Sequence, residues 1–218
     1  MQAITAWVLE EAATQCAAWR SAGCLMTVAV NVSPTNLLEP GFVEVIRRQL
    51  ERHDLPAEAL VLEITETCVI AEFETSRRVI EELRDLGVVV SIDDFGAGVT
   101  SLAYLSSLAV KELKLDRTFI TGLVGGDSDR ELDLVRSTIE LGHAMGLRIV
   151  AEGIEDDATL RLLSDLGCDF AQGYCISKPK PASELAFRSH PLSGPASGMV
   201  NGSRHPLVGV GPDTTPTS

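Results

Sequence analysis

A short apolar run that ends on two adjacent carboxylates limits the folds open to this chain more than any other stretch. Residues 87–100 read GVVVSIDDFGAGVT. The β-branched run at 88–92 favours a strand, and a nearly continuous apolar run is typical of a parallel strand covered on both faces. Asp93 and Asp94 follow directly, and two glycines then allow a sharp turn. Because neighbouring carboxylates repel each other without a cation or proton between them, the stretch predicts either a metal site or a solvated turn.

Similar apolar runs alternate with amphipathic helical patterns along most of the chain. Strands are predicted at residues 26–32, 60–65, 88–92, 112–115, 147–151 and 169–172. Helices are predicted at residues 3–20, 42–53, 73–86, 102–108, 128–145 and 160–166. Ser33 and Pro34 are interpreted as a break, and Gly87 as the cap of the helix before the Asp-Asp strand. This alternation through short connections predicts an α/β fold with parallel strands and right-handed crossovers.

Composition and charge narrow the function classes. With 218 residues and 45% hydrophobic residues, the chain can form one sizeable core without disulfide or metal crosslinks. A formal net charge of −13 argues against binding a nucleic acid polymer or an anionic membrane, so an anionic substrate would need a metal. Five cysteines without a CxxC pair indicate free thiols. No apolar run approaches the roughly 20 residues of a membrane span and no signal peptide is visible, so the cytoplasm is the expected location.

Composition also divides the chain into a folded part and a tail. Residues 1–188 carry all of the predicted strands and helices, whereas residues 189–218 are rich in Pro, Gly, Ser and Thr and lack apolar periodicity. We expect one domain at 1–188 and a disordered tail at 189–218. Because the chain opens inside a helical pattern, we also expect that further sequence precedes it.

Each predicted strand carries polar residues at or near its carboxyl end, where α/β folds place their chemistry. These residues are Asn31, Glu63, Asp93 with Asp94, Lys114 with Asp116, Glu152 and Gln172. Singly, each has an ordinary explanation, such as a turn cap, a solvated strand end or a lysine–aspartate pair. Together, the amide and carboxylate oxygens favour hard cations such as Mg²⁺ or Mn²⁺ over zinc. Two such cations with a lysine and a further glutamate suit phosphodiester hydrolysis best.

Six strings in the chain resemble the ordered motifs of the EAL-domain family, the bacterial cyclic di-GMP phosphodiesterases. They are NVS at 31–33, LEITET at 62–67, DDFGAG at 93–98, LKLDRTFI at 113–120, VAEGIE at 150–155 and QGY at 172–174. The resemblance covers about residues 4–187 and implies a modified TIM (β/α)₈ barrel, with about six of the eight strands in this chain. It also implies hydrolysis of cyclic di-GMP to linear pGpG with two Mg²⁺ or Mn²⁺ ions.

The resemblance assigns roles to residues at the matching positions. It implies four metal ligands: Asn31, Glu63, Asp93 and Asp94. Lys114 and Glu152 would position and deprotonate the attacking water, and Asp94 would lie near it. Gln172 and Asp116 would support the site. Glu66 would hold the loop after the Asp-Asp pair, which is associated with dimerisation and activation in the family, so a homodimer and an upstream regulatory domain are expected.

Two departures from the family pattern affect these expectations. The Glu-Ala-Leu motif that names the family belongs to a strand before the first helix predicted here, so the metal site should lack one carboxylate and hydrolysis should be impaired. The loop reads GAGVTS at 96–101 where the family has Gly-Thr-Gly-Tyr-Ser-Ser. Six strands cannot close the barrel, so the first and last should expose edges and the chain should self-associate.

Two other function classes stay open. A non-catalytic module that binds cyclic di-GMP or a protein would keep the fold without metal-dependent turnover. Without the resemblance, a barrel enzyme of the enolase type would use Lys114 to take a proton from a carboxylate substrate bound to Mg²⁺. That enzyme would have no affinity for cyclic dinucleotides.

Overall fold

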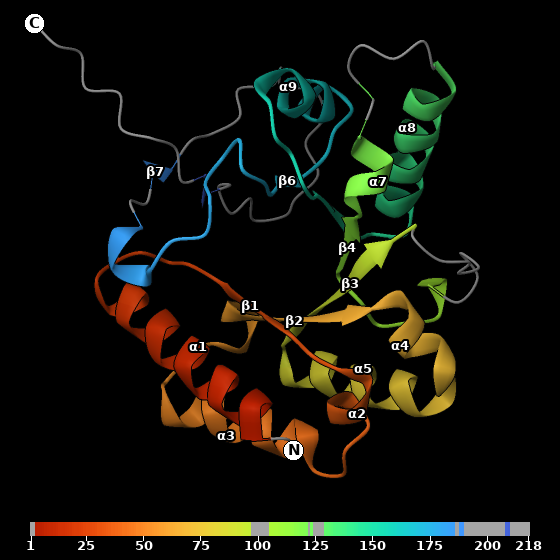
Figure 1. The fold of residues 1–218 in the computed structure, drawn as a ribbon. Helices are drawn as coiled ribbons and strands as arrows, with labels where there is room; N and C mark the ends of the chain where they lie inside the picture. The colour runs from red at the N-terminus through yellow and green to blue at the C-terminus, as the bar shows by residue number, and fades with distance from the viewer. Residues whose placement is uncertain are drawn as a thin grey trace, which may run out of the picture. The chain divides into compact units, whose positions relative to one another are not determined.

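The computed structural model describes residues 3–96, 105–121, 123, 129–185, 188–189 and 208–209. Six strands in these ranges pair in the order of the sequence: β1 (Val28–Asn31), β2 (Leu60–Thr65), β3 (Val89–Phe95), β4 (Glu112–Leu115), β5 (Arg148–Ala151) and β6 (Phe170–Ala171). The pairs β1–β2, β2–β3 and β5–β6 are parallel. Helices separate the strands along the chain (Figure 1), which confirms the predicted α/β class.

The longer helices lie where the apolar periodicity predicts them. They are α1 (Ala3–Ser21), α3 (Phe42–Arg52), α5 (Phe73–Leu86), α8 (Asp129–Ala144) and α9 (Asp157–Asp165). The described residues also contain shorter helices that were not predicted: α2 (Pro34–Leu37), η1 (Ala57–Ala59), α4 (Glu66–Ala71), α7 (Arg117–Ile120) and η2 (Ala182–Glu184). The predicted helix at 102–108 begins outside the described residues.

One local prediction is incomplete and another is wrong. Ser33 and Pro34 follow the end of β1 at Asn31, as a break would, but they also begin α2, where the Ser33 side chain accepts a hydrogen bond from the backbone N of Asn36 at 3.3 Å. Pro34 fits the first helical position because the missing N–H has no partner there in any helix. β3 does not stop at residue 92 but continues to Phe95, so the two aspartates belong to the strand.

The described residues group into two compact units. Unit 1 consists of Met1–Lys114 with Met145–Leu147, and unit 2 of Leu115–Ala144 with Arg148–Ser218. Among the described residues, no helix is both long and apolar enough to cross a bilayer.

In unit 1, helices α1, α3 and α5 pack with strands β1 and β3 around an apolar core. Leu9, Ile46, Leu62, Ile80 and Ile92 are almost fully buried in this core. Burial of such aliphatic side chains stabilises the fold by about 1.5–3 kcal/mol each relative to exposure. The core therefore fixes the strands whose ends carry the polar residues.

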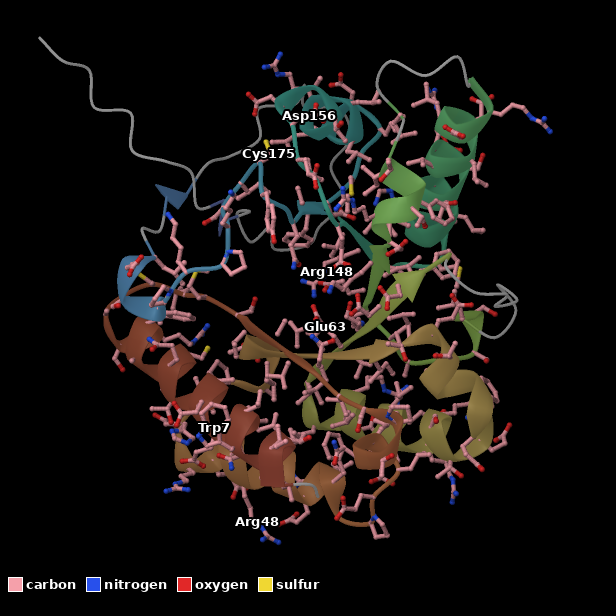
Figure 2. The ribbon with its side chains drawn as sticks, viewed as in Figure 1. Trp7, Arg48, Glu63, Arg148, Asp156 and Cys175 are labelled. Carbon is pink, nitrogen blue, oxygen red and sulfur yellow. The ribbon has the colours of Figure 1, made fainter. Side chains whose placement is uncertain are left out.

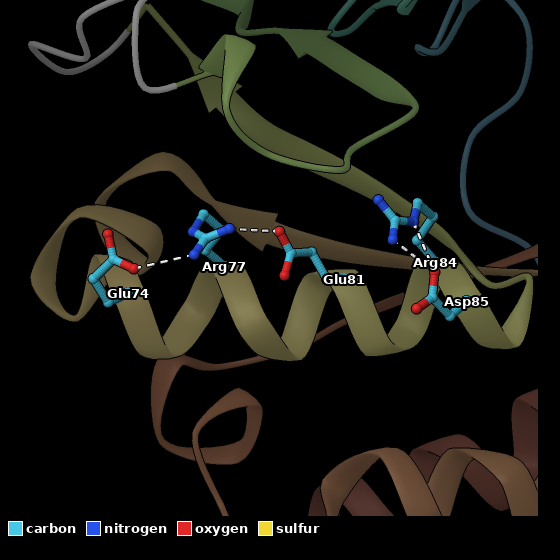
Figure 3. A network of polar contacts seen from close by, with 5 residues as sticks. All are labelled: Glu74, Arg77, Glu81, Arg84 and Asp85. Carbon is cyan, nitrogen blue, oxygen red and sulfur yellow. Dashed lines mark hydrogen bonds and ion pairs between the residues drawn. The ribbon is translucent and has the colours of Figure 1, made fainter.

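Helix α5 carries three ion pairs that are exposed or partly exposed, two of them at helical spacing and one between adjacent residues (Figure 3). Arg77 lies 2.6 Å from Glu81 and 3.3 Å from Glu74, and Arg84 lies 2.7 Å from Asp85. Such pairs contribute only about 0.3–0.5 kcal/mol each because solvent screens them. α5 then ends at Gly87, whose φ of 97° is the left-handed conformation that glycine adopts without strain. The predicted cap is confirmed.

In unit 2, α8 packs on β5, and Val135, Ile139 and Ile149 are buried there. The segment after β6 lies against the segment after β5, since a Cβ at Gly173 would overlap the backbone N and O of Ile154. Burial raises the pKa of the Cys168 thiol to about 12, as suits a packing residue.

The predicted disordered tail at 189–218 lies almost wholly outside the described residues. At the start of the tail, β7 (Arg188–Ser189) pairs antiparallel with β8 (Val208–Gly209).

Candidate functional site

The polar residues of unit 1 line up across neighbouring strands. Asn31 on β1 is in register with Glu63 on β2, and Glu63 is in register with Ser91 on β3. Two residues further along these strands, Thr65 is in register with Asp93. Registered residues of parallel strands point to the same face, and side chains two apart on a strand do so as well. Asn31, Glu63 and Asp93 therefore share one face at the carboxyl ends of three strands.

Lys114 on β4 joins two of these carboxylates. Its Nζ lies 2.8 Å from Glu63 Oε1, which is labelled in Figure 2, and 3.0 Å from Asp93 Oδ1. Lys114 is only 3% exposed. A buried ammonium requires counter-charges because it has lost its hydration. The two carboxylates supply these counter-charges, and the two ion pairs hold Glu63 and Asp93 close together.

Asp93 retains an unused acceptor despite this ion pair. Within the described part of the chain, its buried Oδ1 accepts no well-directed hydrogen bond, although the Lys114 ammonium is 3.0 Å away. The contact between the two groups is therefore electrostatic, with a poorly directed N–H. An acceptor oxygen without a well-aligned donor can still accept a cation.

Asp94 has a left-handed backbone with φ of 56°. Asp tolerates this region better than most residues, and strained backbone at a strand end is common in functional sites. One carboxylate oxygen of Asp94 and one of Asp93 lie within 4.8 Å of each other, and Asp94 is exposed. With Glu63 and the exposed Asn31, these residues offer only oxygen donors. The site in unit 1 thus fits a hard divalent cation.

Glu66 supports the chain just beyond the aspartates. It is buried in the first turn of α4, and its Oε2 accepts a hydrogen bond of 3.4 Å from the backbone N of Gly96. That Glu66 holds the loop after the Asp-Asp pair stays a prediction. The rest of that loop, with the departures at 97–101, lies outside the described residues.

Asp116 belongs to unit 2 and caps α7. It accepts hydrogen bonds from the backbone N of Thr118 at 2.9 Å and from the Thr118 hydroxyl. These bonds, the hydroxyl first, lower the pKa of the Asp116 carboxyl. Its local role is therefore that of a helix cap directly after β4.

Glu152 and Gln172 follow β5 and β6 in unit 2. The backbone N of Glu152 donates to Leu115 O at 3.2 Å, and the backbone N of Gln172 donates to Ala151 O at 2.8 Å. Gln172 O also accepts a hydrogen bond from Ile154 N at 3.1 Å. The backbone thus fixes where both side chains begin, Glu152 being partly exposed and Gln172 exposed.

One residue of the site in unit 1 was not predicted from the sequence, and one short string in unit 1 could be mistaken for a site motif. Ser91 is fully buried in the row of Glu63, and its hydroxyl has no hydrogen-bond partner among the residues that the structure describes. Counting back two residues from Asp93 would have placed it on that face. The letters Glu-Ala-Leu also occur at 58–60, but Glu58 is exposed in η1 ahead of β2, at the opposite end of the strand from Glu63.

Comparison with known proteins adds a family to this geometry. The model of the EAL domain matches residues 1–179. The chain is 41% identical over 180 residues to "Bifunctional diguanylate cyclase/cyclic di-GMP phosphodiesterase MucR" of Pseudomonas aeruginosa, covering 82% of this chain and 26% of that protein. It is 34% identical over 185 residues to "Cyclic di-GMP phosphodiesterase PA2567" of the same organism, covering 85% and 31%. The chain spans about a quarter of the length of the curated relatives it matches.

Solved structures agree with the sequence match. "PaMucR Phosphodiesterase, c-di-GMP complex" has a TM-score of 0.78 at 38% identity, over 83% of this chain and 73% of that one. The EAL domain of Mycobacterium smegmatis DcpA has a TM-score of 0.76 at 40% identity, over 82% and 80%. Both the fold and the sequence therefore match across most of the aligned chains. This chain belongs to the EAL-domain family.

Proposed function

We propose that the chain is a cyclic di-GMP phosphodiesterase domain that hydrolyses cyclic di-GMP to linear pGpG. The names of its relatives support the substrate and the reaction. The solved MucR phosphodiesterase is a complex with cyclic di-GMP, which supports binding of this nucleotide. The observation that carries the proposal is the buried group of Lys114, Glu63 and Asp93 on neighbouring strands. These are three of the residue types and positions that the family motifs require.

Two Mg²⁺ or Mn²⁺ ions are the proposed cofactors. Four residues would hold them: Asn31, Glu63, Asp93 and Asp94. When bound, such ions activate a water and stabilise the charge of the phosphoryl oxygens. The donor set supports this choice because all four side chains present oxygen.

The remaining residues would act on the substrate and the water. Lys114, which is charged in its ion pairs, would orient the attacking water by donating hydrogen bonds. Glu152 would accept the proton of that water, and Asp94 would lie close to it. Gln172, Glu66 and Asp116 would position the segments that follow their strands.

The broader biological setting is part of the proposal. The active protein would be a homodimer in the bacterial cytoplasm, with a regulatory domain upstream and no membrane segment in these residues. Residues 1–188 would form the domain and 189–218 a tail. Turnover by this chain alone would be slow, because the resemblance places a further carboxylate ligand in the Glu-Ala-Leu motif, ahead of the first helix.

Hydrolysis by the chain in saturating Mn²⁺, with pGpG measured by chromatography, tests the proposal. Asp93→Asn should lower turnover at least about 100-fold, which is the scale of losing one strong transition-state group. Asp85→Asn is the matched control, since Asp85 is exposed on α5. Metal-dependent turnover that Asp93→Asn leaves unchanged would contradict the site. Binding of cyclic di-GMP without any turnover would instead favour the non-catalytic module.

A further inference from the structure

The buried ammonium of Lys114 lies beside two carboxylates, which is the position of the bound ion in a cation-binding site. It contacts Glu63 Oε1 at 2.8 Å and Asp93 Oδ1 at 3.0 Å, and the side chains of Glu63 and Asp93 are 11% and 13% exposed against 4% for Lys114. These two oxygens come from adjacent strands, and both belong to residues in the proposed ligand set. The same carboxylate oxygens therefore serve a cation supplied by the chain itself.

A divalent ion at Glu63 and Asp93 would have to share these oxygens with the ammonium. Two positive charges within a few ångströms in a poorly solvated place repel each other strongly. For a metal ion to bind tightly there, the ammonium must withdraw from at least one carboxylate. If it does not withdraw, the metal ion binds with lower affinity. The charge of Lys114 thus acts against metal binding, whatever it does later in the reaction.

We propose that Lys114 is a built-in counter-cation that competes with the metal for Glu63 and Asp93. In the metal-free protein its single positive charge offsets part of the charge of the two carboxylates and lets them stay close together. Metal binding displaces the ammonium, which can then orient the attacking water. This role rests on the proposed function for its metal, and it adds that one residue limits metal affinity and supports turnover.

Removing the charge gives effects of opposite sign on the two properties. Lys114→Met should bind Mn²⁺ at least about tenfold more tightly than the unsubstituted chain in calorimetric titration, because the competing charge is gone. Its hydrolysis of cyclic di-GMP should fall. Lys114→Arg keeps the positive charge and should not bind Mn²⁺ more tightly. Lys111→Met removes a lysine whose side chain is exposed, and it should leave the affinity unchanged.

Melting curves provide a second readout that needs no activity. Mn²⁺ should raise the melting temperature of Lys114→Met more than that of the unsubstituted chain, since a ligand that binds more tightly stabilises the folded state more. If Lys114→Met lacks structure in metal-free buffer, Mn²⁺ should restore its circular dichroism spectrum by supplying the missing charge. A variant that stays unfolded in Mn²⁺ would overturn the proposal.

Two further outcomes distinguish a failure of this proposal from a failure of the proposed function. Equal or weaker Mn²⁺ binding by Lys114→Met would overturn the competition and leave phosphodiesterase activity untouched. Tighter binding by Lys114→Met, with no turnover by the unsubstituted chain, would support the competition and count against the enzyme.

Discussion

Asp94 shows how one residue can combine a backbone and a chemical requirement. Its φ of 56° lies in the left-handed region, where Asp and Asn are tolerated but a residue such as Ala is strained. Substitution to alanine therefore changes the backbone as well as the carboxylate. An alanine variant alone cannot separate the two effects.

We expect Asp94→Asn to keep the stability of the chain and to lower hydrolysis at least about 100-fold, because only the charge is lost. Asp94→Ala should lose the same activity and also about 1 kcal/mol of unfolding free energy from strain. Denaturant titrations of both variants, with Asp94→Gly as the unstrained control, give the comparison. Equal stability of the alanine and glycine variants would contradict the role of the backbone.

The sequence predicted which strand ends carry polar residues, but it did not predict the contacts of those residues. Polar residues at strand ends could be found because a parallel sheet brings its carboxyl ends to one edge. The Lys114 ion pairs could not, since the partner of a long flexible side chain depends on the register and burial of three strands. Ser91 could have been placed on this face by counting back two residues from Asp93, but a small residue inside an apolar run gives no sign of a role in a site.

Two helix caps, Asp116 and Asp156, are carboxyl groups whose pKa is lowered in the folded chain. Asp156 begins α9 and accepts hydrogen bonds of 2.8 Å from the backbone N and the hydroxyl of Thr159. These bonds lower the pKa of Asp156 in the folded chain, the backbone bond first. A lowered folded pKa means that the stabilisation is complete above the ordinary Asp value of about 3.9 and is lost as the pH falls through the folded value.

Asp156→Ala should lower the melting temperature at pH 7 and should lose less further stability between pH 5 and pH 3 than the unsubstituted chain. Asp156→Asn keeps an acceptor for Thr159 without a titrating group. It should stay close to the unsubstituted chain at pH 7 while sharing the weaker acid dependence. Calorimetric melting at the three pH values measures both effects. An unchanged acid dependence in both variants would show that other groups dominate it.

Long helices could be predicted from the sequence and short ones could not. Helices such as α5 repeat an apolar face over several turns, so their period is visible. The four-residue helices α2 and α7 are each set by one capping side chain, Ser33 and Asp116. The sequence pattern was interpreted differently at both residues, with Ser33 as part of a break and Asp116 as a residue that supports the site. A single cap is too short a pattern to outweigh such interpretations.

At the scale of the whole molecule, the division of the chain at residue 188 stays a prediction. Removing residues 189–218 would take away β8, Ser189 of β7 and the two paired positions between these strands, which is a small contact. We therefore expect the melting temperature and any hydrolysis to stay unchanged. Differential scanning calorimetry of the shortened and full chains measures this. A clear fall in melting temperature would mean that the tail docks on the domain.

The ion pairs of Lys114 also bear on how such a protein is made. A chain that carries its own positive charge between two buried carboxylates can fold as it leaves the ribosome, before it has met any metal. Its abundance in the cell would then be independent of manganese or magnesium supply. When the ion is scarce, the protein would be folded but inactive, and it would not be degraded as an unfolded chain. When the supply returns, activity would return without new synthesis.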